Sequence, residues 1–212
     1  LQGSLITVEA SDSLFEEVGK NSYTFEDLLS ELIDNSIAGR YDDRAVQIDI
    51  TVAISMDNPE RNYIRVKDDG KGMPIEILGK ALSLAAIRTS GSLNEHGMGM
   101  KQAVAGLGQL EQLTTKTLGS GYADSIDGFR FGTFHTKLKK VDWESGTEII
   151  IKNLKAIVPT DERTSYDRRI PSLLGARYRR FLGPDNRRAV ISLERVDLDD
   201  NSRPLVARTL NA

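Results

Sequence analysis

The stretch AVQIDITVAI, residues 45–54, places an apolar side chain at every second position from 46 to 54. Strict alternation of this kind is typical of a β-strand with one buried face. A second short segment, NYIRV at 62–66, follows and predicts a further strand. The chain is therefore expected to build a β-sheet that buries one side.

Other segments carry the signals of helices and hairpins. Residues 24–38 combine helix periodicity with Thr24 and Asp27 in the spacing of a capping box. Pro74 stands at the expected first position of a helix over 75–87. The remaining predicted elements are a polar, glycine-rich loop at 88–99, a short helix at 100–106, strands between 110 and 153 with a hairpin turn at Asp127 and Gly128, and a last strand at 146–153. This pattern predicts the α/β class.

The composition excludes several kinds of site. The 212 residues include no cysteine and two histidines, His96 and His135, so neither a disulfide framework nor a cysteine- or histidine-rich zinc site is expected. We find no apolar run of about 18 residues and no leader, so we expect no membrane contact. A net charge of −3 means that any nucleic-acid contact has to come from a local patch. An intracellular location is expected, cytoplasmic or, in a eukaryote, nuclear.

The composition shifts beyond Asn153. Residues 154–167 are rich in turn formers, whereas IPSLLGARYRRFL at 170–182 predicts a helix and RAVISLERV at 188–196 predicts a strand. We therefore expect one domain over 1–153, followed at 154–212 by the start of a second domain or a C-terminal extension.

Three polar residues stand out in the helix predicted at 24–38. Glu31, Asp34 and Asn35, within ELIDNSIAGR, cluster on the side of the helix that faces away from its leucines. In an arbitrary amphipathic helix, such a stripe is a solvated face. A functional reading needs support from other segments.

Two glycine-containing motifs bear on that choice. DDGKG at 68–72 comes after a strand, where a carboxylate can be held at the sheet edge and glycines let a flat ligand approach the backbone. EHGMGMK at 95–101 places two glycines before a predicted helix, and N–H groups at a helix N-terminus attract phosphate. Taken singly, the first motif reads as a plain turn and the second as a simple loop.

Together, ELIDN, DDGKGM, HGMGMK and GTEIII resemble the motif series of the GHKL ATPases, the superfamily of gyrase B subunits, heat-shock chaperones, histidine kinases and MutL proteins. The resemblance spans residues 24–153 and looks strongest to microrchidia or heat-shock-chaperone members. It implies a two-layer α/β sandwich of the Bergerat type, with a mixed, mostly antiparallel sheet, helices on one face and a C-terminal α/β segment. It also implies Mg²⁺-dependent hydrolysis of ATP to ADP and phosphate.

The resemblance implies roles for individual residues. Glu31 matches the general base that orients the attacking water, and Asn35 matches a Mg²⁺ ligand. Asp68 matches the acceptor for the adenine amine, Thr147 matches a threonine at the same edge, and Asp34 would support the pocket. The other residues expected to bind the nucleotide are Gly70, Gly72, Met73, Gly97, Met98, Gly99, Met100 and Lys101.

Residues 88–99 would form a lid over the ATP, with hinge freedom supplied by its glycines. Closure would hold the phosphates against the amides of 97–101, where Lys101 is expected to contact a phosphate. His96 is expected to be a solvated loop residue. The methionines of these segments, Met73, Met98 and Met100, are expected to pack rather than to react.

The implied function is an ATPase whose lid closure gates the dimerisation of a longer, clamp-like protein, with action on DNA left open. Members of this superfamily usually receive a lysine or arginine from the following domain, so we expect slow turnover by these 212 residues alone. The alternative is a nucleotide-responsive interaction module with negligible turnover. A protein kinase of the same fold is disfavoured, because those kinases characteristically lack the glutamate found at Glu31.

An arginine-rich segment over 163–188 leaves two interpretations open. It holds eight arginines against Asp167 and Asp185. This local excess of positive charge can meet DNA phosphates, or it can face acidic residues of the chain's own N-terminal part or of a second subunit.

Overall fold

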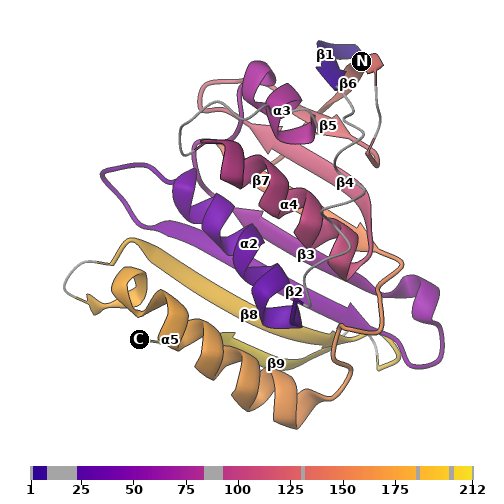
Figure 1. Cartoon of the computed structure of the whole chain (residues 1–212), viewed down its shortest axis with the longest axis vertical. Helices are drawn as coiled ribbons and strands as arrows, with labels where there is room; N and C mark the ends of the chain where they lie inside the picture. Colours follow the sequence, from indigo (N-terminus) through magenta and orange to yellow (C-terminus); the bar gives the residue numbers. More distant parts are fainter. Residues whose placement is uncertain are drawn as a thin grey trace.

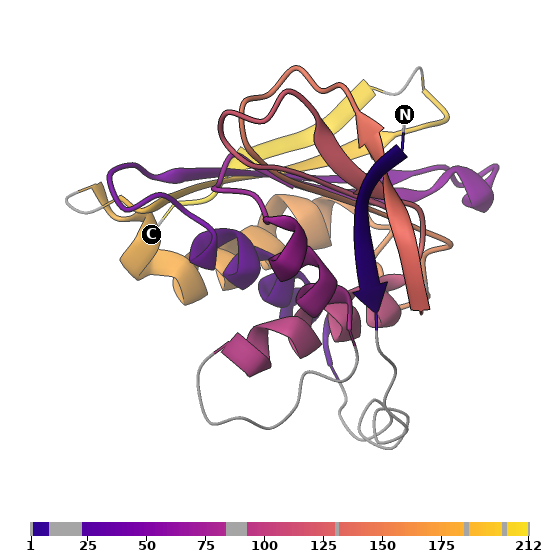
Figure 2. The same cartoon turned by 90° about the horizontal axis from the view of Figure 1, so that it is seen from above.

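A computed structural model describes residues 2–8, 23–83, 93–129, 132–184, 187–200 and 203–211. Within these residues the chain forms one nine-stranded sheet in the order β1-β6-β5-β4-β7-β3-β2-β8-β9. Figures 1 and 2 show the helices α2, α3, α4 and α5 together on one face of this sheet. The predicted two-layer α/β arrangement is confirmed.

The sheet is antiparallel at every neighbouring pair except β2 and β8, which run parallel. The predicted mixed, mostly antiparallel sheet is therefore confirmed. The strands are β1 (Gln2–Val8), β2 (Val46–Ile54), β3 (Tyr63–Asp68), β4 (Gln109–Lys116), β5 (Ala123–Ile126), β6 (Gly132–Lys139), β7 (Gly146–Lys152), β8 (Ala189–Asp197) and β9 (Arg203–Thr209).

Most of the helical elements lie where the sequence predicts them. They are α2 (Phe25–Ala38), η1 (Pro59–Arg61), α3 (Ile75–Leu82), α4 (Leu93–Leu107), η2 (Glu162–Arg169) and α5 (Ile170–Leu182). The capping box at the start of α2 is present: the Thr24 hydroxyl accepts from the Asp27 N–H at 3.2 Å, and the Asp27 carboxylate accepts from the Thr24 N–H at 3.1 Å. Two otherwise unpaired N–H groups of the first turn are thereby satisfied.

The core lies between α2 and the middle strands. Leu28, Leu29, Leu32 and Ile33 of α2 are 2% exposed or less, and they belong to one apolar cluster that also contains the inward side chains of β2 and β3. Burial of such side chains stabilises the fold by about 1.5–3 kcal/mol each. It also fixes which side of α2 faces away from the sheet, and that side carries the polar stripe.

Two helices differ from the sequence prediction at their ends. The helix expected over 75–87, α3, ends at Leu82, because the backbone of Ser83 is extended. Residues 93–99, expected as part of a loop, are the first turns of α4, so the helix begins seven residues before Met100 and its glycines lie inside it. Close packing explains two of these glycines, Gly99 and Gly106. A Cβ at Gly99 would lie 2.0 Å from Glu31 Oε2, and one at Gly106 would lie 2.6 Å from Leu28 Cδ1. The missing side chains let α4 approach α2. The part of the predicted lid at 88–92 lies outside the described residues.

A further difference concerns residues 162–169, which fall in and just beyond the turn-rich stretch at 154–167. They form a π-helical segment, η2, that leads directly into α5. Asp161 stabilises its start, because the carboxylate accepts from the Ser165 N–H at 2.8 Å and from the Ser165 hydroxyl at 2.7 Å. Such wide turns are rare and usually short.

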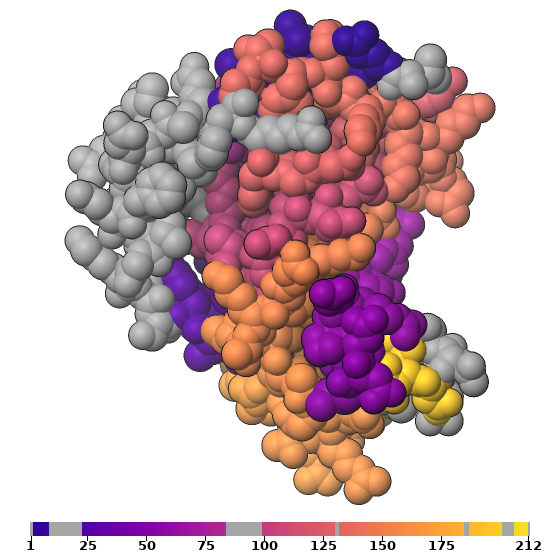
Figure 3. All heavy atoms as spheres, turned by 90° about the vertical axis from the view of Figure 1, so that its right-hand side faces the viewer, coloured from indigo at the N-terminus to yellow at the C-terminus, as the bar shows by residue number. Residues whose placement is uncertain are grey.

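The C-terminal segment joins the same sheet and the same core as the residues before it. β8 pairs with β2 over its whole length, and apolar residues of η2, α5 and β8 belong to the common cluster. Just beyond the C-terminal end of β2, the Asp199 carboxylate accepts from the N–H groups of Met56 and Asp57 at 2.6 and 3.2 Å. In Figure 3, purple atoms of the region after β2 lie beside yellow atoms of the C-terminal segment. The division into domains at Asn153 stays a prediction.

Candidate active site

The site is anchored by Asp68, the last residue of β3. Its Oδ1 accepts from the N–H groups of Gly70 at 2.9 Å and Thr147 at 3.2 Å, and its Oδ2 accepts from the Ser36 hydroxyl at 3.0 Å. Burial raises the pKa of Asp68 to about 6, although these hydrogen bonds oppose the shift. One carboxylate thus ties together the ends of β3 and β7 and the last turn of α2.

The glycines around Asp68 are required by neighbouring backbone. Gly72 has a φ of 68°, and a Cβ there would lie 2.0 Å from the Lys116 carbonyl oxygen. A Cβ at Gly70 would lie 2.8 Å from the Gly39 carbonyl oxygen, which also accepts from the Lys71 N–H at 2.8 Å. The loop after β3 therefore lies directly on α2's end and on β4. The role of these glycines in making room for a base stays a prediction.

A pair of threonines continues the site along the sheet edge. The Thr147 and Thr115 hydroxyl oxygens are 3.3 Å apart, and Thr115 Oγ1 accepts from the Met73 N–H at 2.7 Å. Thr147 was predicted, whereas Thr115 was missed. Met73 packs against the core cluster, as expected. The only sequence signal for Thr115 is its place in β4. Thr115 lies beside Thr147 because β4 pairs with β7.

Glu31 and Asn35 lie one turn apart on α2, beside Ser36. The Asn35 amide N–H₂ donates to the Glu31 carbonyl oxygen at 2.7 Å. Because that contact requires the N–H₂ group, the amide oxygen Oδ1 faces the other way. A neutral amide oxygen is a hard donor of the kind that Mg²⁺ binds together with phosphate oxygens, so Asn35 fits the predicted ligand. The Glu31 carboxylate lies against the backbone of Gly99.

Lys101 lies deeper than the sequence suggests. It is 6% exposed, and its Nζ donates to the Ser83 carbonyl oxygen at the end of α3. Burial lowers the pKa of Lys101 to about 8. Met100 is 5% exposed and belongs to the core cluster, while Gly97 and Met98 lie within α4. A contact between Lys101 and a phosphate stays a prediction, as do the roles of Gly97, Met98 and Gly99.

Asp34 has a partner that the sequence does not reveal. Its Oδ1 accepts from the Tyr178 hydroxyl of α5 at 2.9 Å, and its Oδ2 lies 4.0 Å from Arg177 Nη2. Since 144 positions separate Asp34 and Tyr178 in the chain, only the packing of α5 on α2 brings them together.

The arginine-rich segment divides between two environments. Arg169 pairs with Glu26 at 2.6 Å, and Arg177 pairs with Asp27 at 3.5 Å, so part of its charge meets acidic residues of the chain's own α2. Another part lines a surface cavity of about 440 Å³. The cavity is lined by Arg40, Asp42, Asp43, Arg44, Arg187 and Arg188. The first of the two interpretations, contact with DNA, stays a prediction.

Residues 23–152 match the family model described as "Histidine kinase-, DNA gyrase B-, and HSP90-like ATPase". No curated protein matches the chain. Among the described residues, no helix is long and apolar enough to cross a membrane.

Two solved structures share the fold at low identity. One is the N-terminal domain of a DNA repair protein, with a TM-score of 0.57, 19% identity, and 95% of this chain and 57% of that chain covered. The other is the Aquifex aeolicus MutL ATPase domain complexed with ADP, with a TM-score of 0.51, 14% identity, and coverage of 88% and 64%. The chain thus spans less than two thirds of either structure.

Proposed function

Because the chain belongs to the family of histidine kinase-, DNA gyrase B- and HSP90-like ATPases, we propose that it binds ATP with Mg²⁺ beside α2 and hydrolyses it to ADP and phosphate. The observation that carries this proposal is the buried Asp68 carboxylate, held at the end of β3 by donors from three different elements.

Asp68 is the proposed acceptor for the exocyclic amine of adenine. An ionised carboxylate offers about four acceptor positions, and Ser36, Gly70 and Thr147 occupy three of them. The remaining position suits an N–H donor. Guanine presents a carbonyl oxygen where adenine has its amine, so Asp68 would favour adenine. Thr147, through its Oγ1, and Gly70, Gly72 and Met73 complete this end of the proposed site.

Glu31 is the proposed general base. Its carboxylate would orient the attacking water and accept its proton. Asn35 would hold Mg²⁺ through Oδ1, and the bound ion would neutralise charge on the triphosphate. Residues 97–101 and the side chain of Lys101 would contact the phosphates, for which Lys101 has to leave the Ser83 carbonyl.

Lid closure, dimerisation as a clamp, a DNA contact through 163–188 and an intracellular location belong to the same proposal. One structural relative is named as a DNA repair protein, which supports the DNA-related part, and the other is an ATPase domain complexed with ADP, which supports nucleotide binding. The narrower similarity to microrchidia or heat-shock chaperones stays a prediction. The chain covers 57% and 64% of these relatives, and its turnover would be slow if a lysine or arginine from outside it completes the site.

A nucleotide-responsive dimerisation module with negligible turnover is the alternative. Two measurements on wild type and Glu31→Ala separate it from an ATPase: ATP affinity by calorimetry and phosphate release under single-turnover conditions. An ATPase keeps its affinity and loses phosphate release in the variant. Equal, background-level release from both proteins, with ATP still bound, would establish the alternative instead.

A further inference from the structure

The polar side of α2 faces two different neighbours. Glu31 and Asn35 belong to the candidate active site, with Gly99 of α4 against the Glu31 carboxylate. Asp34 instead meets α5, where Tyr178 donates to its Oδ1. All three residues lie within a single stretch of five, residues 31–35. Asp34 therefore shares one turn of α2 with Glu31 and Asn35.

The Tyr178 hydroxyl has two acceptors on α2. It lies 2.9 Å from Asp34 Oδ1 and 3.0 Å from the Ser30 carbonyl oxygen. Ser30 and Asp34 are the two ends of one helical turn, and Glu31 lies between them. Tyr178 is only 2% exposed, and burial raises the pKa of its hydroxyl, so it remains a neutral donor.

We propose that Tyr178 is a positioning residue for ATP hydrolysis: its hydroxyl fixes the turn from Ser30 to Asp34 and so orients the Glu31 carboxylate toward the attacking water. The proposal rests on the proposed function. Tyr178 lies outside the residues that match the family model, 23–152, so α5 would add a part of its own to the site. It would also couple the C-terminal segment to the rate of hydrolysis.

This role predicts a selective effect on turnover. The next part of α2 is anchored independently, because the Ser36 hydroxyl donates to Asp68 at 3.0 Å. Removing the Tyr178 hydroxyl therefore frees the turn that carries Glu31 while the proposed adenine end keeps its contacts. Misplacement of a reacting group by about 1 Å can cost about 100-fold in rate, so a smaller shift still lowers kcat measurably.

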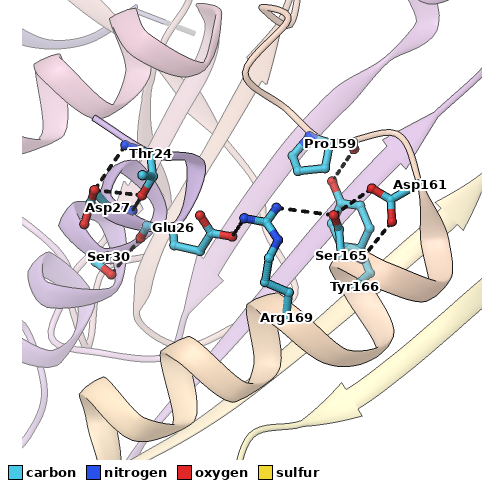
Figure 4. A network of polar contacts seen from close by, with 9 residues as sticks. All are labelled: Thr24, Glu26, Asp27, Ser30, Pro159, Asp161, Ser165, Tyr166 and Arg169. Atoms are coloured by element: carbon cyan, nitrogen blue, oxygen red, sulfur yellow. Dashed lines mark hydrogen bonds and ion pairs between the residues drawn. The ribbon is translucent and has the colours of Figure 1, made fainter. Parts of the chain in front are cut away.

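The chain offers a matched control in Tyr166 of η2. Its side chain is fully buried, and its hydroxyl donates to the Pro159 carbonyl oxygen at 2.8 Å, away from α2 (Figure 4). Its ring meets Phe25 edge-on with 6.3 Å between centroids. Tyr166→Phe thus removes the same kind of buried hydroxyl from the same core without touching the turn that holds Glu31.

The test compares Tyr178→Phe with Tyr166→Phe in the 212-residue chain. We expect Tyr178→Phe to lower the single-turnover rate of phosphate release about 10-fold, with ATP affinity within about twofold of wild type and a Tm like that of Tyr166→Phe. An equal rate in the two variants would overturn the proposal, and so would a loss confined to affinity. If wild type itself releases no phosphate, the proposed hydrolysis fails first and the role of Tyr178 fails with it.

Variants of Asp34 test the same contact from the other side. Asp34→Asn keeps an oxygen acceptor for Tyr178, whereas Asp34→Ala removes it, so the rate of Asp34→Asn should lie closer to wild type. The double variant Asp34→Ala/Tyr178→Phe should be no slower than Tyr178→Phe alone, because both changes break one contact. Rate losses that multiply in the double variant would show that the residues act independently and would contradict the proposal.

Discussion

The two ends of the candidate active site are built differently. At the Asp68 end, the carboxylate is held by Ser36, Gly70 and Thr147, which come from α2, the loop after β3 and β7. At the Glu31 end, the surrounding groups come from α4, where Gly99 lies against the carboxylate and Lys101 is directed to Ser83. The first end is fixed by the sheet, whereas the second depends on how helices pack on one another.

This difference separates binding from turnover. Changes at the sheet end should alter nucleotide affinity, and those that displace the neighbouring backbone should alter folding as well. Changes at the helix end should alter the rate of hydrolysis with less effect on affinity.

The largest effect is expected where the sheet end has no space. Gly72→Ala should lower the free energy of unfolding by more than about 3 kcal/mol, because a Cβ would lie 2.0 Å from the Lys116 carbonyl oxygen and the backbone would have to move. Gly119→Ala is the control: Gly119 has a similar φ of 81° but no atom within 4 Å, so only about 1 kcal/mol of backbone strain is expected. Denaturant unfolding of both variants measures the difference. Equal losses would show that the loop after β3 is not tightly seated.

Asp68→Asn should come next in size. It should lower ATP affinity about 10- to 100-fold, because a hydrogen bond to a charged acceptor contributes about 1.5–3 kcal/mol. The fold should tolerate it, since the Asn N–H₂ can donate to Ser36 Oγ while the Ser36 hydroxyl donates to the Leu32 carbonyl oxygen, now 3.2 Å away. Calorimetric titration with ATP measures the loss, and a Tm at or above that of wild type shows that folding is intact. Unchanged ATP affinity would remove Asp68 from the binding site.

The pH dependence of stability should also differ between wild type and Asp68→Asn. The pKa of Asp68 is about 6 in the folded chain against an ordinary 3.8, so the unfolded chain loses this proton first as pH rises. The contribution of Asp68 to the free energy of unfolding should therefore fall by about 2 kcal/mol between pH 4 and about 7. Asp68→Asn lacks this loss, so its stability relative to wild type should rise across that window. A constant difference from pH 4 to 7 would contradict a raised pKa.

The smallest effects are expected among the arginines that pair with α2. Arg169 and Arg177 have side chains 45% and 47% exposed, but their partners differ: the Glu26 side chain is 9% exposed and the Asp27 side chain 45%. Arg169→Ala should cost about 1–3 kcal/mol, because it leaves a buried carboxylate unpaired. Arg177→Ala should cost less than about 0.5 kcal/mol. Thermal unfolding ranks the two, and a reversed order would contradict the described burial of Glu26.

The sequence was sufficient for elements that carry their own local signals. The capping box of Thr24 and Asp27 and the alternation over 45–54 predicted α2 and β2, because helix and strand periodicities are visible within one segment. The ordered series of motifs also predicted the family and its layered fold.

The sequence was insufficient where contacts join distant segments. Glycines usually interrupt helices, so the start of α4 at Leu93 was missed. The glycines are there because α4 approaches Glu31 and Leu28 closely. Thr115 and Tyr178 were missed for a similar reason, since strand pairing and helix packing place them beside Thr147 and Asp34. Periodicity within a segment carries no information about such partners.

The most direct test is a crystal structure of the chain with Mg²⁺ and a non-hydrolysable ATP analogue. The account predicts that the exocyclic amine nitrogen of adenine lies about 2.7–3.2 Å from a carboxylate oxygen of Asp68. A base bound elsewhere, with Asp68 still held only by Ser36, Gly70 and Thr147, would contradict it.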